Sequence, residues 1–219
     1  MIDKYLTADI CDVNIEVDTP NFVVMTEDGG DGGDNILPKG YKNVDYIEFS
    51  GEQIVDTGVI LNQNSKIRVL FTRERQTQHY LYGVASSDNT ASVTAYLGGS
   101  WRFGDKTSTK SISTSEDMVY SGFVDSQKIA VTGSASTIGQ VNDFETIGSL
   151  IIGGCRGSNG GIGDPQFVGK IYIFLICEGE KQILKLIPVT DGNLYRFYDV
   201  IGKKFHDSIT GTALRGGNL

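Results

Sequence analysis

Hydrophobic and polar residues alternate along many short stretches of this chain, and turn-forming residues separate the stretches. Ile67, Val69 and Phe71 alternate with Arg68 and Thr72, the pattern of a strand with one face toward a core and the other toward water. No segment keeps an apolar stripe of helical period over three turns. Strands are predicted at 44–49, 53–60, 66–74, 79–86, 92–98, 101–104, 118–124, 127–132, 149–153, 167–178, 182–189 and 194–206. The pattern therefore predicts an all-β protein.

The run from Ile171 to Cys177 is the longest strongly apolar stretch, and it does not alternate. A strand of this kind is covered on both faces, so we expect it at the centre of a sheet. It is far too short to cross a bilayer, which takes about 20 residues as a helix. Residues 178–181 then predict a hairpin turn, after which residues 182–189 pair with the central strand.

The first 43 residues form a separate part of the pattern. Two short strands, interrupted around Pro20, are indicated by alternating apolar residues: Val13, Ile15, Val17, Phe22 and Val24. Residues 28–35 contain only Gly, Asp and Asn, which predicts a flexible hinge. We therefore divide the chain into an N-terminal arm with its hinge, residues 1–43, and a domain at 44–219. The apolar residues of the arm make it a candidate assembly element, because such strands add to the sheet edge of a neighbour.

Composition and charge narrow the class of protein. The chain has 28 Gly, 4 Pro, 10 Tyr and 10 Phe, which is typical of short strands joined by glycine-bearing turns. The chain has 19 Lys and Arg and 27 Asp and Glu, and the resulting formal charge of −8 argues against a nucleic-acid partner. Charged residues near the start argue against a signal peptide, and we expect no membrane insertion. Cys11, Cys155 and Cys177 lack metal spacing and are expected to be reduced structural thiols.

Several stretches carry a resemblance to a known family. They are YIEFSGEQIVDTGV at 46–59, LYGV at 81–84, GSWRFG at 99–104, FVGKIY at 167–172, LIPV at 186–189, LYRFYDV at 194–200 and GKKF at 202–205. In this order and spacing, the region from about 44 to 210 resembles the laminin G-like, concanavalin A-like jelly-roll domains of bacteriophage virion proteins and gut-bacterial surface proteins. The resemblance implies a two-sheet antiparallel jelly-roll sandwich and leaves the arm outside the match. It implies fold more firmly than activity, because this sandwich hosts lectins, glycosidases and scaffolding proteins.

Catalytic machinery is not expected. Glycosidases of this superfamily use paired carboxylates spaced Glu-x-Asp-x-x-Glu, whereas this chain offers only Glu16 and Asp18, with Asn21 at the third position. His79 and His206 stand in no recognisable triad or metal-spaced setting. The sequence therefore predicts that the protein is not an enzyme.

No cofactor or essential metal is predicted either. Asp28, Asp31 and Asp34 do not have the ligand spacing of an EF-hand loop. Asp88 and Asp105 are the alternatives for a Ca²⁺ at the sandwich rim, which many domains of the resembled family hold, although no motif fixes that site.

Candidate glycan contacts are Tyr80, Tyr96, Trp101 and Asn159. A planar ring packs against a sugar face, and a nearby amide supplies orienting hydrogen bonds. Core packing is the alternative for the rings. Asn159 belongs to the glycine cluster at 153–163, for which a plain connection between strands is the alternative to a binding loop.

The resemblance and the arm lead to the functional hypothesis. We expect a bacteriophage virion structural protein, made in the host cytoplasm, that decorates a capsid or belongs to a head fibre or tail. Its partners would be other virion proteins, contacted through residues 1–43. The alternative is a lectin-like adhesin that binds host surface glycans through loops at 86–105 and 153–166. Repeated copies of either would gain avidity, but the sequence sets no stoichiometry.

Overall fold

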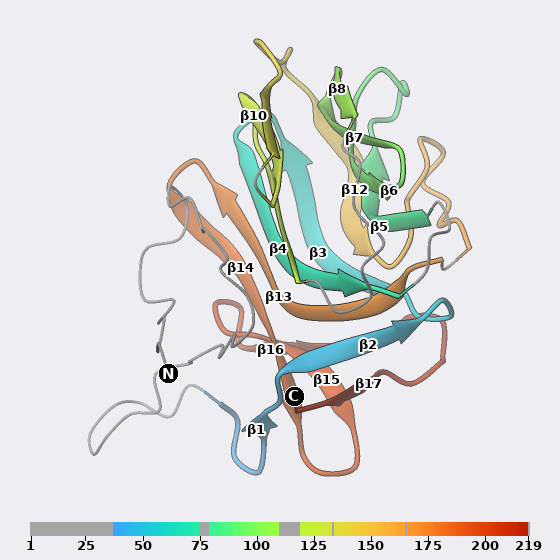
Figure 1. The fold of residues 1–219 in the computed structure, drawn as a ribbon, viewed down its shortest axis with the longest axis vertical. Helices are drawn as coiled ribbons and strands as arrows, with labels where there is room; N and C mark the ends of the chain where they lie inside the picture. The colour runs from blue at the N-terminus through green and yellow to red at the C-terminus, as the bar shows by residue number, and fades with distance from the viewer. Residues whose placement is uncertain (1–36, 75–78, 110–118, 133, 165, 219) are drawn as a thin grey trace.

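The computed structural model describes residues 37–74, 79–109, 119–132, 134–164 and 166–218 of the 219-residue chain. Every regular element in these ranges is a β-strand, and the strands form two antiparallel sheets stacked as a jelly-roll sandwich (Figure 1). The predicted fold class is therefore confirmed. The described ranges contain no helix that could cross a membrane.

The larger sheet, sheet A, has 11 strands, and its main path runs β11-β10-β9-β4-β13-β14-β15-β16. Three further strands extend it, with β1 on β14, β2 on β13 and β17 on β2. The bounds are β1 Lys42–Asn43, β2 Tyr46–Ser50, β4 Ser65–Arg73, β9 Tyr120–Val124, β10 Lys128–Val131, β11 Ser134–Thr137, β13 Val168–Glu178, β14 Lys181–Thr190, β15 Tyr195–Asp199, β16 Lys204–His206 and β17 Arg215–Gly217.

The smaller sheet, sheet B, has 6 strands in the order β3-β12-β5-β6-β7-β8. The bounds are β3 Val55–Asn62, β5 His79–Ala85, β6 Ser92–Leu97, β7 Ser100–Gly104, β8 Lys106–Thr109 and β12 Glu145–Ile152.

Strand β13 organises sheet A, as its apolar run predicted. It pairs with β4 along one edge, and its other edge pairs with β2 near Ile171 and with β14 from Phe174 onward. The turn after β13 contains Gly179 at φ +60°, a left-handed conformation that glycine adopts without strain. The predicted central strand and the predicted hairpin are both confirmed.

The main core lies between the sheets, where alternate residues of each strand meet. Phe174 of β13 contacts Tyr82 of β5 across the interface, with ring centroids 5.6 Å apart. Tyr82 in turn meets Trp101 of β7 edge to face at 6.0 Å. All three side chains are fully buried. Because these rings come from both sheets, they fix how the two layers stack.

The outward face of sheet A is apolar as well. One cluster on β4 and β13 comprises Leu70, Tyr172, Ile173 and Leu175, and a second on β14 and β15 comprises Ile187, Val189 and Tyr198. Leu37 and Tyr41 pack against the second cluster, and β1 pairs with β14. The end of the predicted arm, residues 37–43, therefore packs on sheet A. The remainder of the predicted arm and its hinge, including Val13, Ile15, Val17, Phe22 and Val24, lies outside the described residues.

The cysteines differ from one another. Cys155 is a free thiol, and burial raises its pKa to about 11. Cys177, on β13, is disulfide-bonded. The expectation of reduced thiols is therefore wrong for Cys177, because sequence spacing does not show which cysteines a fold brings together.

Candidate functional site

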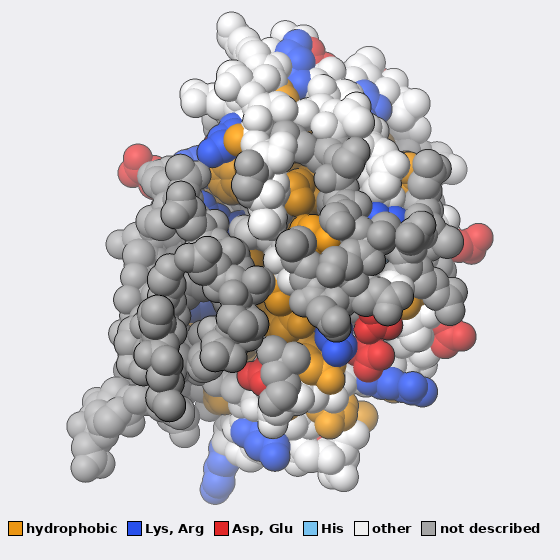
Figure 2. All heavy atoms as spheres, in the orientation of Figure 1, with side chains coloured by type: hydrophobic (Ala, Val, Ile, Leu, Met, Phe, Trp, Pro, Cys, Tyr) orange, Lys and Arg blue, Asp and Glu red, His pale blue; other side chains and the backbone are white. Residues whose placement is uncertain are grey.

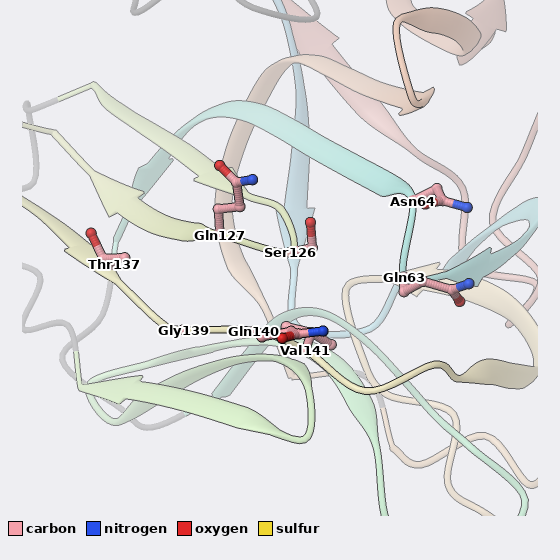
Figure 3. Close-up of a pocket in the computed structure, with 8 residues that line it drawn as sticks. All are labelled: Gln63, Asn64, Ser126, Gln127, Thr137, Gly139, Gln140 and Val141. Atoms are coloured by element: carbon pink, nitrogen blue, oxygen red, sulfur yellow. The ribbon is translucent and has the colours of Figure 1, made fainter.

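A pocket of about 400 Å³ opens at one rim of the sandwich. Figure 3 shows that three connections between strands form it. The β3–β4 turn and the β9–β10 turn each supply two residues, and the end of β11 and the segment after it supply the other four. The lining is Gln63, Asn64, Ser126, Gln127, Thr137, Gly139, Gln140 and Val141. All eight are uncharged, and the amide and hydroxyl groups among them are donors and acceptors suited to a neutral polar ligand.

Short hydrogen bonds hold the turns that build this pocket. The carboxylate of Asp125 accepts from the backbone N–H of Gln127 at 2.8 Å and from that of Lys128 at 2.6 Å. The carbonyl of Gln127 accepts from the N–H of Ile138 at 2.9 Å, and this bond joins the β9–β10 turn to the segment that follows β11. The pocket wall is thus preformed by the backbone, an arrangement that lowers the ordering cost of binding.

The glycine cluster at 153–163 is an ordered loop. Arg156 anchors it through three nitrogen atoms: Nη2 donates to the carboxylate of Asp56 at 2.8 Å, Nε to the carbonyl of Ser149 at 3.1 Å, and Nη1 to the carbonyl of Gly160 at 3.2 Å. Ser149 also donates its hydroxyl to Asp56. Gly153 adopts φ +89°, and a Cβ there would lie 2.5 Å from the carbonyl oxygen of Gln53. The loop is therefore fixed on β3 and β12, which differs from a merely flexible connection.

The four candidate glycan contacts do not form one site. Tyr80 and Tyr96 face each other across β5 and β6, with ring centroids 4.8 Å apart and both side chains partly exposed. Burial raises the pKa of Tyr80. Trp101 is 0% exposed and packs in the core, so it is not available to a ligand. Asn159 lies in the Arg156-anchored loop, where its side-chain oxygen accepts from the N–H of Gly161 at 2.9 Å.

The histidines and rim aspartates also have local roles. Both His79 and His206 are buried, and Nδ1 of His206 lies 2.8 Å from the carbonyl oxygen of Asp56. Asp88 accepts from Ser86 and Thr90 within its own turn. Asp105 accepts from Lys106 and Asn142. Within the described ranges, no three His, Cys, Asp or Glu side chains gather as a metal site.

The sequence did not point to the rim pocket. Its lining residues are polar and scattered over three connections, and none belongs to a recognisable motif. The only sequence signal was the turn chemistry, such as Asp125 before Ser126, which predicts a turn without saying what the turn faces.

No family model matches the chain, and no curated protein matches it. Among solved structures, a native heptameric SAP-like pentraxin from Limulus polyphemus shares 12% sequence identity with it. That match has a TM-score of 0.37 and covers 61% of this chain and 70% of the pentraxin chain. The assignment of a two-sheet sandwich rests on the strand pairing of this chain itself.

Proposed function

We propose that this protein is a structural component of a bacteriophage virion, in which the sandwich is displayed and residues 1–43 provide attachment. The proposal comes from the family resemblance in the sequence. The observation that supports it best is where the resembling stretches fall. They fall on β2, β3, β5, β7, β13, β14 and β15, which contribute half of the buried residues of the main core.

Two edge strands of the sandwich are of a kind that does not favour pairing with a neighbouring molecule. β8 at one edge of sheet B and β11 at one end of sheet A are short and built from Ser, Thr, Ala and Lys. Short polar edge strands disfavour pairing with a neighbouring sheet. Sandwich-to-sandwich association through these two edges is therefore disfavoured, which leaves attachment to another part of the chain.

Localisation in the intact particle tests this function. Deleting residues 1–40 should abolish incorporation into virions, measured by mass spectrometry of purified particles, and circular dichroism of the shortened protein checks that the sandwich still folds. A matched control deletes only the hinge residues 29–33, which should preserve incorporation. Full incorporation of the longer deletion would contradict attachment by the arm, and absence of the native protein from particles would overturn the whole proposal.

We propose glycan binding at the rim pocket as the second candidate function. The supporting observation is the uncharged, amide-rich lining, because amides hydrogen-bond sugar hydroxyls through both donors and acceptors. A glycan array with the full chain should show binding that Gln127→Ala and Gln63→Ala each weaken at least tenfold. Gln166→Ala, an exposed glutamine outside the pocket, is the matched control. If the native protein binds no glycan on the array, the glycan-binding proposal fails and only the structural role remains.

A further inference from the structure

The outward face of sheet A is apolar and deeply buried. Leu70, Tyr172, Ile173 and Leu175 are between 1% and 8% exposed, although they point away from the inter-sheet core. Their strand neighbours Val69 and Phe174 fill that core instead. Figure 2 shows hydrophobic side chains gathered over the region where Figure 1 draws β13 and β2. A continuous apolar sheet face of this kind is stable in water when something covers it.

The chain enters the sandwich on this same face. Leu37 and Tyr41 pack against Ile187, Val189 and Tyr198, which lie on the outward side of β14 and β15. The ring of Tyr41 lies 4.5 Å from that of Phe205. Residues 1–36 therefore join the described part of the chain at the apolar outward face of sheet A.

The charges of these two parts of the chain are complementary. Residues 1–36 contain nine Asp and Glu and one Lys, which leaves 18 acidic and 18 basic residues in the rest of the chain. The formal charge of −8 thus resides entirely in the first 36 residues. The outward side of sheet A presents Arg68 and Lys185 on either side of Leu175, and Lys66 beside Cys177. An acidic segment with alternating apolar residues matches a face of this composition.

The cysteines point to the same face. Cys177 is 4% exposed and follows Leu175 on the outward side of β13. It is disulfide-bonded, whereas Cys155 is free. The chain has three cysteines, so Cys11 is the one that remains to pair with Cys177 within the chain.

We propose that residues 1–36 fold back across the outward face of sheet A of their own chain, with Cys11 bonded to Cys177. The reach is ample: from Val189, beside Leu37, to Gln182, opposite Cys177, is about 23 Å along β14. The 26 residue-to-residue steps from Cys11 to Leu37 span up to roughly 85 Å when extended. Val13, Ile15 and Val17 follow Cys11 directly and supply the apolar contacts beside Leu175 and Tyr172.

The bond forms by thiol–disulfide exchange. The thiolate of one cysteine attacks a small-molecule disulfide, such as oxidised glutathione, and the thiolate of the other then displaces the bound half. The two cysteines lose two protons and two electrons in total, and the small disulfide is reduced to two thiols. In a reducing compartment the segment is held by the apolar and charge contacts alone.

This inference does not rest on the virion function. It does restrict how the arm would attach, because a segment held on its own sheet must leave that face before it binds a partner. A failed particle-incorporation experiment would leave the intramolecular cover untouched, and the reverse also holds.

Tryptic digestion of the alkylated, unreduced full chain tests the covalent part. The three cysteines fall on separate peptides, 5–39, 129–156 and 171–181. After oxidation with oxidised glutathione, mass spectrometry should find peptide 5–39 linked to 171–181. Cys155→Ser should keep this link, and Cys11→Ser should abolish it. A link to 129–156, or no link, would overturn the proposed pairing, as would hybrid linked peptides after co-oxidation of unlabelled and ¹⁵N-labelled chains.

Hydroxyl-radical footprinting of the full chain under reducing conditions tests the cover itself. Peptide 171–181 contains Tyr172 and Leu175, and it should be oxidised several-fold less in the native protein than in a Val13→Asp, Ile15→Asp, Val17→Asp variant. The control variant, Gly29→Asp, Gly30→Asp, Gly32→Asp, adds the same three charges without removing an apolar side chain, and it should oxidise as the native protein does at this peptide. Equal oxidation in the native and triple-Asp proteins would overturn the docking of residues 1–36 on this face.

Discussion

Arg156 and Asp56 join the glycine loop to strand β3 through a contact of 2.8 Å between Nη2 and Oδ2, although 100 positions separate them in the sequence. The same guanidinium donates to the carbonyls of Ser149 and Gly160. An ammonium group cannot reproduce this planar set of donors. We therefore expect both Arg156→Ala and Arg156→Lys to lower the free energy of unfolding by about 1–3 kcal/mol.

Denaturant unfolding and hydrogen exchange check this expectation. The N–H groups of Gly157, Gly160 and Gly163 donate within the loop and should lose protection in both variants. Arg215→Ala, an exposed arginine on β17, serves as the control and should change neither quantity. Unchanged loop protection in Arg156→Ala would contradict the anchoring role.

The buried hydroxyl of Tyr82 is expected to lower the stability of the fold. The side chain is 0% exposed, and its oxygen has no hydrogen-bond partner among the described residues. Burial raises its pKa far above the ordinary value of a tyrosine. An unsatisfied buried hydroxyl opposes folding, so Tyr82→Phe should raise the free energy of unfolding by about 1 kcal/mol.

Thermal and denaturant unfolding of Tyr82→Phe measure this effect. Tyr80→Phe is the matched control on the same strand, where the side chain is partly exposed, and it should be close to neutral. A clear loss of stability in Tyr82→Phe would show that the hydroxyl has a favourable partner.

Apolar pattern was sufficient to predict the strands that bury most area. The run at 171–177 became β13, the central strand of sheet A, because a stretch with no polar side has to be covered on both faces. The strands missed were β1, β8, β11 and β17, which are short and give no apolar alternation. The predicted strand at 194–206 is two strands, β15 and β16, separated by a turn in which Lys203 adopts φ +53°.

Contacts between distant segments were beyond the sequence patterns. The alternation in Ser100-Trp101-Arg102-Phe103 already places Trp101 on the same side as Phe103, so its burial was within reach of the pattern. The pairing of Arg156 with Asp56 was not, because no local preference links two residues that far apart. The rim pocket had the same problem, since its lining comes from three separate connections.

Cys155 should react slowly in the folded protein. It is partly buried beside Gly83, where a Cβ would lie 2.6 Å from its sulfur, and burial raises its pKa to about 11. Because the thiolate is the reactive form, only about 0.1% of the thiol is ionised at pH 8, against about a quarter for an ordinary cysteine. Iodoacetamide should modify peptide 129–156 at least tenfold more slowly in native protein than in urea. Equal rates would show that the loop leaves the thiol open.

Asp88 gives the turn between β5 and β6 a dependence on acid pH. Its pKa is lowered to about 2, first by the hydrogen bond from Ser86 Oγ at 2.6 Å, and then by those from the N–H and hydroxyl of Thr90. An unfolded aspartate titrates near pH 4, so the folded state favours the carboxylate. A depressed pKa contributes stability that is fully present above about pH 4 and is lost as the pH falls toward 2.

NMR titration of the Asp88 carboxyl group measures this directly, and Ser86→Ala should raise its pKa because that change removes the largest cause of the shift. In unfolding experiments, the stability difference between native protein and Asp88→Asn should shrink as the pH is lowered from 4 to 2. The carboxylate accepts from two residues at once, whereas a neutral amide oxygen is the weaker acceptor for both. If Asp88 titrates near pH 4 in the folded protein, these hydrogen bonds do not favour its charged form, and the turn is held by the backbone bond from Asn89 to Ser86 instead.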